Sequence, residues 1–293
     1  MIEIFLDQTF WIIALGTGLL GASSGILGSF AVLKNQSLLG DAISHAALPG
    51  IVLAYIISGE KSSIYLLTGG LLCGILGAFF VHDMVKNSKI KTDTALGIVL
   101  SVLFGLGMML LTYVQSIQDA GQAGLEMYLF GQAATILKKD IYLMLAFLIP
   151  SLLLVLALWK EIKIYLFDSE YAVTIGIPVE KINLLITVLV VIIIVMGLQT
   201  VGVVLMSSLL LAPAAAARQW TNSLSKMLGI SALIGAVSGL AGTYLSAVSI
   251  NLPTGPVIVL LVSAIVFISI LIAPNRGLIF KYFKKSKLQH PLK

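Results

Sequence analysis

Two residues that could bind a metal ion stand four positions apart in an otherwise apolar stretch of the sequence. Asp41 and His45 lie within residues 40–50, which read GDAISHAALPG. Residues four apart in an α-helix share one face, with about 5–6 Å between their Cβ atoms. A carboxylate and an imidazole on one face form half of a site for Mn²⁺, Fe²⁺ or Zn²⁺. No thiolate stands nearby, which argues against a Cu(I) site.

The same pair also has a structural interpretation, in which Asp41 caps a helix and His45 bonds to a neighbouring span. Insertion scales put the cost of a centrally placed Asp at about 2.5–3.5 kcal/mol, so an ionisable residue inside a membrane favours a functional role. A site built by one chain would be incomplete, because the later spans contain no second carboxylate or His. Either two copies of the pair converge across a dimer axis, or backbone carbonyls, Ser44 or water complete the ligand set.

The composition indicates that the elements positioning this pair lie in a membrane. Of the 293 residues, 59% are hydrophobic and 11% are charged, and the mean hydropathy is +1.06. Soluble globular proteins have about 25% charged residues. The composition therefore argues against a cytosolic enzyme, a nucleic-acid-binding protein or a disordered chain, and the single cysteine, Cys73, argues against a disulfide scaffold.

Nine stretches are long and apolar enough to cross a bilayer core, which takes about 20 helical residues. The second is short, and the two spans around Gln199 could be one bent element, so eight spans are the alternative. We expect an all-α, polytopic membrane protein with eight to nine transmembrane helices. The predicted spans are residues 10–33, 44–58, 63–81, 94–113, 141–159, 182–198, 200–217, 226–248 and 254–273.

The basic residues predict the orientation of these spans. With nine spans, all but three of the 18 Lys and Arg residues fall on one side, together with the basic tail 276–293. Cytoplasmic loops retain Lys and Arg, so the C-terminus is expected inside and the N-terminus outside. The net charge of +5 then reflects topology and predicts no nucleic-acid partner. The three exceptions are Lys61, Lys138 and Lys139.

Two connections are more than simple turns. The outer one is expected to contain a half-helix over about residues 121–138. In the inner one, Asp168 and Glu170 can start a short helix, and Gly176 with Pro178 can stop it. A short cytoplasmic helix over about residues 166–178 is therefore predicted, with an ordinary solvated loop as the alternative.

Three residues in or beside the predicted spans are candidates for a pore or a gate. Pro213 interrupts a small-residue segment ending at Arg218, which suggests a pore-lining or gating element; Ser44 and Pro49 are further candidates.

The sequence has no Gly-x-x-x-x-Gly-Lys-[Ser/Thr] loop, so we expect the chain not to hydrolyse nucleotide itself. A transporter of this kind would be driven by another subunit, which could push on the cytoplasmic helix.

Residues 28–50, which include the Asp41–His45 pair, resemble the signature of the ABC-3 family, the permeases of bacterial manganese, zinc and iron ABC importers. Residues 90–98, 129–132 and 211–215 match further blocks of that family in the same order, and the likeness covers roughly residues 10–275. The wider relation is to type II importers such as the vitamin B12 permease.

This resemblance implies one transmembrane permease domain over residues 1–293, in the plasma membrane of a bacterium. Two such chains, alike or different, would bind two ATPase subunits and receive metal from an external solute-binding protein. The ion would be cargo and not a cofactor: Mn²⁺ is favoured by residues 122–126 and 129–132, with Zn²⁺ and Fe²⁺ as alternatives. Asp41 and His45 would contact it. The coupling helix seated in the ATPase groove would include Asp168, Glu170, Ala172 and Gly176.

Other readings stay open from the sequence. The chain could be a stand-alone secondary transporter or channel that uses Asp41 and His45 for protons or cations, or a membrane scaffold that does not transport. Lys138 and Lys139 are predicted to lie under an acidic patch of the docked binding protein, and the alternative is that they are simply solvated.

Overall fold

The computed structural model describes residues 7–60, 62–116, 131, 136–249, 252–274 and 277. Within these residues all regular structure is helical. Eight of the helices are long and apolar enough to cross a membrane, and the 18-residue α11 (Val203–Trp220) packs among them as a ninth. The expected all-α membrane fold with eight to nine spans is therefore confirmed.

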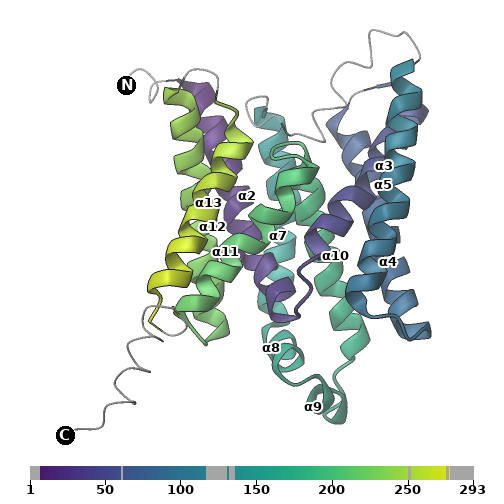
Figure 1. Cartoon of the computed structure of the whole chain (residues 1–293), viewed down its shortest axis with the longest axis vertical. Helices are drawn as coiled ribbons and strands as arrows, with labels where there is room; N and C mark the ends of the chain where they lie inside the picture. Colours follow the sequence, from purple (N-terminus) through teal and green to yellow (C-terminus); the bar gives the residue numbers. More distant parts are fainter. Residues whose placement is uncertain are drawn as a thin grey trace, which may run out of the picture.

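The long helices run alternately up and down, so that α2 begins at the upper end of Figure 1 and α13 ends at the lower end. Two short helices, α8 and α9, protrude at the lower end. In chain order the elements are α2 (Gln8–Leu33), α3 (Leu39–Ser58), α4 (Ser63–Asn87), α5 (Thr92–Ser116), α7 (Lys138–Ala157), α8 (Trp159–Phe167), α9 (Ser169–Thr174), α10 (Val179–Leu198), α11 (Val203–Trp220), α12 (Leu224–Val248) and α13 (Thr254–Ile272).

Several boundaries differ from those predicted. Helix α3 starts at Leu39, five residues before the expected span, so Asp41 and His45 both lie within it. The chain breaks between α10 and α11 at Gly202, whose φ of 87° favours glycine, so these are two helices and not one bent element. The predicted outer half-helix and basic tail fall almost wholly outside the described residues.

Helices α2 and α12 approach so closely that glycine is required between them. A Cβ atom on Gly235 would overlap the backbone of Gly21, and one on Gly239 would overlap the backbone of Thr17. The same interface contains a hydrogen bond of 2.9 Å between the hydroxyls of Thr17 and Thr243. Small residues allow such backbone contact in membranes, where no hydrophobic driving force holds helices together.

Helix α10 lies at the centre of the core. Nearly all of its second half, from Leu189 onward, is buried, and it contacts α2, α3 and α4. Helices α5, α7 and α13 instead expose large apolar side chains, including Val102, Leu153 and Phe267. Such an outward apolar surface suits contact with lipid. The core therefore braces α3, the helix that carries Asp41, and α2, the helix before it.

Candidate functional site

The first two turns of α3 carry the candidate metal ligands. The His45 Nε2 atom lies 3.3 Å from the Asp41 Oδ1 atom, as the four-residue spacing predicted. The Asp41 side chain is 38% exposed, whereas that of His45 is 14% exposed. Asp41 stands in the first turn, where the positive end of the helix dipole favours a carboxylate.

An aromatic residue of α5 contacts the imidazole ring of His45. The ring of Phe104 meets that of His45 edge-on, with the centroids 4.4 Å apart and the planes at 71°. The Nδ1 atom of His45 is buried and has no hydrogen-bond partner among the described residues. Sequence reasoning missed Phe104, because an apolar residue on another helix gives no local signal.

Asp41 opens into a hollow whose lining is largely apolar but includes four serine residues. The hollow has a volume of about 420 Å³ and lies between the start of α3 and helices α11 and α13. Carboxylate and hydroxyl oxygens are suitable first ligands for Mn²⁺ and other divalent cations. The four serines of the lining were not predicted as site residues, and they appear in the full set of lining residues: Ser37, Leu38, Asp41, Ser207, Ser208, Leu211, Ala212, Ala215 and Ser263.

The three pore or gate candidates do not line this hollow. Ser44 is fully buried and donates its hydroxyl to the backbone oxygen of Gly40, at 2.7 Å. Pro49 is buried inside α3 against α5, where it faces Gly107. Pro213 is buried within α11, although its neighbour Ala212 does face the hollow.

One chain provides only part of a metal-ligand set. In the described part of the chain, no group of three or more His, Cys, Asp or Glu side chains is placed to hold a metal ion. Asp41 and His45 would supply two ligands, and the neighbouring side-chain oxygens, those of the serines, are uncharged. The geometry therefore leaves room for ligands from outside the chain at the exposed side of Asp41.

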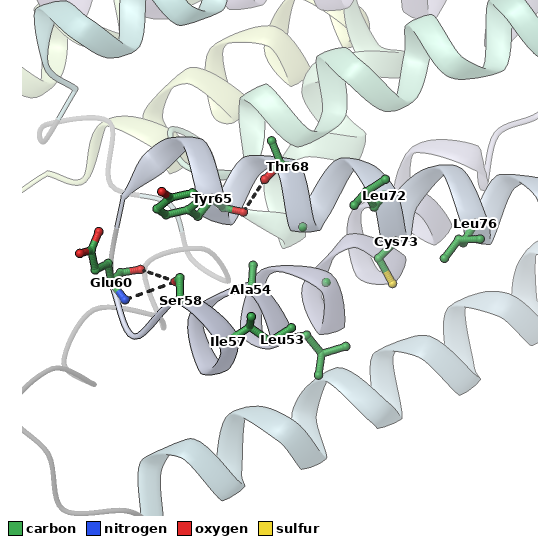
Figure 2. A pocket seen from close by; sticks show the side chains of 12 residues that line it. Leu53, Ala54, Ile57, Ser58, Glu60, Tyr65, Thr68, Leu72, Cys73 and Leu76 are labelled. Atoms are coloured by element: carbon green, nitrogen blue, oxygen red, sulfur yellow. Dashed lines mark hydrogen bonds between the residues drawn. The ribbon is translucent and has the colours of Figure 1, made fainter.

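A larger cavity between α3 and α4 has a different character. Figure 2 shows it lined by Leu53, Ile57, Leu72 and other apolar side chains, and its volume is about 600 Å³. Its polar groups bond locally: Thr68, for example, donates its hydroxyl to the Tyr65 backbone oxygen at 2.8 Å. Such a lining offers little to a hydrated cation, so size alone does not identify the site.

Local hydrogen bonds cap both ends of α9, the short helix at the lower end of the molecule in Figure 1. The Asp168 side chain accepts a hydrogen bond from the Tyr171 backbone N–H, at 2.8 Å. At the other end, Gly176 has a φ of 81°, and the N–H of Ile177 bonds to the oxygen of Ala172. These bonds satisfy backbone groups that a helix end would leave unpaired.

The predicted coupling residues differ in where they face. Ala172 is fully buried against the rest of the chain, so it anchors α9 and offers no surface to a partner. Glu170, Tyr171 and Val173 are exposed on the outside of α9. Sequence reasoning missed the two hydrophobic members of this exposed face.

Lys138 and Lys139 lie at the opposite end of the molecule. They are the first two residues of α7 and both are exposed. The next residue, Asp140, is buried and accepts a hydrogen bond from the Leu137 backbone N–H, at 3.0 Å. The two lysines therefore stand on a fixed helix start that faces away from α8 and α9.

Comparison with known proteins gives consistent similarity along nearly the whole chain. Residues 7–273 match the ABC 3 transport family. The zinc transport system membrane protein TroC of Treponema pallidum (strain Nichols) is 46% identical over 98% of this chain and 97% of its own length. The manganese transport system membrane protein MntC of Bacillus subtilis (strain 168) is 45% identical over 96% of this chain, which spans 65% of that relative's length.

Two solved structures share the fold. PsaBC from Streptococcus pneumoniae, solved in complex with Fab, has a TM-score of 0.83 and 31% identity, over 98% of this chain and all of that one. A metal-chelate type ABC transporter in an inward-facing conformation has a TM-score of 0.64, over 87% of this chain and 84% of that one. Its 16% identity supports the fold alone.

Proposed function

The chain belongs to the ABC 3 transport family, and from this premise we propose that it is the membrane-spanning subunit of an ATP-driven importer of a divalent metal ion, with Mn²⁺ favoured. Relatives at 45–46% identity are named as manganese and zinc transport system membrane proteins. The sequence carries no nucleotide-binding loop of its own, so separate ATPase subunits would hydrolyse ATP. The multi-pass chain would lie in a bacterial plasma membrane, with the C-terminus inside and the N-terminus outside.

The observation that carries the site assignment is the Asp41–His45 pair at the edge of a hollow that four serines help to line. A cation in the hollow could bind the exposed Asp41 carboxylate directly, and His45 is held within 3.3 Å of it. A second permease chain, alike or different, that brings its own pair to this hollow would complete the ligand set. Carboxylate, imidazole and hydroxyl groups suit Mn²⁺, Fe²⁺ and Zn²⁺ alike, so the site chemistry leaves Zn²⁺ and Fe²⁺ as alternatives.

Uptake by the complete transporter tests this function. Vesicles that contain the chain with its ATPase subunits and solute-binding protein should accumulate Mn²⁺ only when ATP is present, and competition with Zn²⁺ and Fe²⁺ would rank the cargoes. Vesicles with the chain alone should not accumulate it. Metal flux through the chain alone would instead favour a stand-alone secondary transporter or channel.

The cytoplasmic partner would be an ATPase subunit bound at α9. Tyr171→Asp should weaken its binding by about 30-fold, because truncating or charging a central aromatic anchor typically removes 2 kcal/mol or more. Co-purification with a titrated ATPase subunit measures this. Lys160→Ala, an exposed change on the neighbouring α8, is the matched control. Equal ATPase binding by the two variants would contradict a contact at α9.

The external partner would be a solute-binding protein docked near the start of α7. With both Lys138 and Lys139 changed to Glu, association should slow at least several-fold at low salt, because charges at an interface rim act mainly on the on-rate. The difference should shrink at high salt, where charges are screened. Stopped-flow association measures both effects, with Lys226→Glu at the start of α12 as control. If the double variant associated with the same salt dependence as the wild type, the proposed docking role of Lys138 and Lys139 would be wrong.

A further inference from the structure

Residues 34–41, which comprise the connection from α2 to α3 and the start of α3, form a thin wall between two cavities of different character. On one side, Ser37, Leu38 and Asp41 line the hollow next to α11 and α13. On the other side, Lys34 and Leu39 line a partly open polar cavity of about 160 Å³. Neighbouring residues of one short segment thus face opposite cavities, so a shift of the segment changes both of them.

Lys34 ties this wall to α8. Its ammonium contacts the Tyr165 hydroxyl and lies 3.4 Å from the centre of the Tyr165 ring. Tyr165 is 3% exposed and donates its hydroxyl to the Asn183 Oδ1 atom of α10, at 2.6 Å. The chain of contacts therefore runs from α2 through α8 to α10, and a charged lysine suits both the hydroxyl oxygen and the face of the ring.

The same tyrosine lies close to α9. Tyr165 stands three residues before Asp168, the residue that caps α9, and the Asp168 backbone N–H bonds to the Ile164 oxygen at 2.8 Å. A displacement of α9 must therefore reach Tyr165 within one helical turn. At the far side of the wall, Gly40 lies against Ser207 and Leu210 of α11, where an added Cβ would come within 3.1 to 3.2 Å of them. Movement of the wall relative to α11 would change the hollow at Asp41.

We propose that Lys34 is a positioning residue that couples α9 to the metal site: by binding Tyr165, it transmits displacement of α8 and α9 to the segment that carries Asp41. This inference rests on the proposed ATP-driven import. It assigns to Lys34 and Tyr165 the mechanical link between the ATPase-facing helix and the cargo site, with no direct contact between either residue and the metal.

The charge of Lys34 gives the proposal a pH signature. Burial lowers the pKa of Lys34 to about 8. The ammonium is therefore present below that pH and is lost as the pH rises through it, together with its attraction to Tyr165. The other titratable groups lining the cavity, among the described residues, are His82 of α4 and Tyr165 itself; α5 and α10 contribute neutral Thr92, Asn183 and Thr187. A nearby ion pair, Lys86–Glu180 at 2.8 Å, does not line it.

The test measures the number of Mn²⁺ ions imported per ATP hydrolysed by the complete transporter between pH 6.5 and pH 9.5. In the wild type this ratio should fall with a midpoint near 8. Lys34→Arg should keep the ratio high throughout, because a guanidinium stays charged. Lys34→Met should give a ratio at least tenfold below that of the wild type at pH 6.5 and should show no further fall as the pH rises, while Lys226→Met, an exposed change on α12, should follow the wild type.

The outcomes separate this inference from the proposed function. If the wild-type complex shows no ATP-dependent import, the proposed function itself is wrong. If the wild type imports Mn²⁺ but Lys34→Arg falls with the same midpoint, the titrating group is not Lys34 and the link is refuted. Tyr165→Phe adds a check that does not depend on the lysine variants: it keeps the ring, loses the hydroxyl and should show an intermediate ratio at pH 7, whereas an unchanged ratio overturns the proposed chain of contacts.

Discussion

Asp41→Ala and His45→Ala should each reduce metal import by the complete transporter to background. Loss of residues that merely support a metal ligand typically lowers affinity 10–100-fold, so loss of a ligand should exceed about 100-fold. Asp41 is the charged group that faces the hollow, and His45 lies 3.3 Å behind it. Radioactive Mn²⁺ uptake into vesicles, normalised to the amount of inserted protein, measures the effect.

Two further variants distinguish a metal ligand from a structural pair. Asp41→Asn keeps the shape of the side chain and its capacity to accept hydrogen bonds, but it removes the charge. If Asp41 only stabilises the first turn of α3, this variant should import normally; if it binds the cation, import should be lost. Ser44→Ala is the matched control, because Ser44 is one turn away, buried and bonded to the Gly40 backbone oxygen. Normal import by both Asp41→Ala and His45→Ala would contradict the assignment of these residues to the metal site.

The sequence identified one half of the candidate site because that half is local. The spacing of Asp41 and His45 needs only a helix to bring them together, and the helix is there. Ser207, Ser263 and Phe104 lie on three other helices, and their proximity depends on how those helices pack. In a membrane the helices are apolar on nearly every side, so hydrophobic periodicity does not reveal which face turns inward.

The same distinction explains α8 and α9, the two short helices at the lower end of Figure 1. The ends of α9 follow from Asp168 and Gly176, which act through bonds to neighbouring backbone groups. Helix α8 was not predicted as a separate element, because the break at Leu158 has no capping side chain. The start of α3 was placed too late because the span was delimited by apolarity, while the residues before it are partly polar. Capping is readable from sequence, but a break imposed by packing is not.

The packing of α2 against α12 should be highly sensitive to an added methyl group. Gly235→Ala should lower the free energy of unfolding by about 1–3 kcal/mol, the usual effect of overpacking a well-packed interior. The new Cβ would overlap the Gly21 backbone, which cannot turn aside as a flexible side chain can. Thermal unfolding of the detergent-purified protein would show this as a lower melting temperature.

Gly229→Ala provides the control on the same helix. Nothing lies within 4 Å of the Cβ it would add, so the higher helix propensity of alanine should leave stability unchanged or raise it by up to about 1 kcal/mol. Equal melting temperatures for Gly229→Ala and Gly235→Ala would show that the two helices can separate at little cost. The consequence would reach the site, because α2 ends at Lys34 and the segment after it carries Asp41. If α8 displaces the Lys34 segment as proposed, the close contact with α12 would hold the rest of α2 in place.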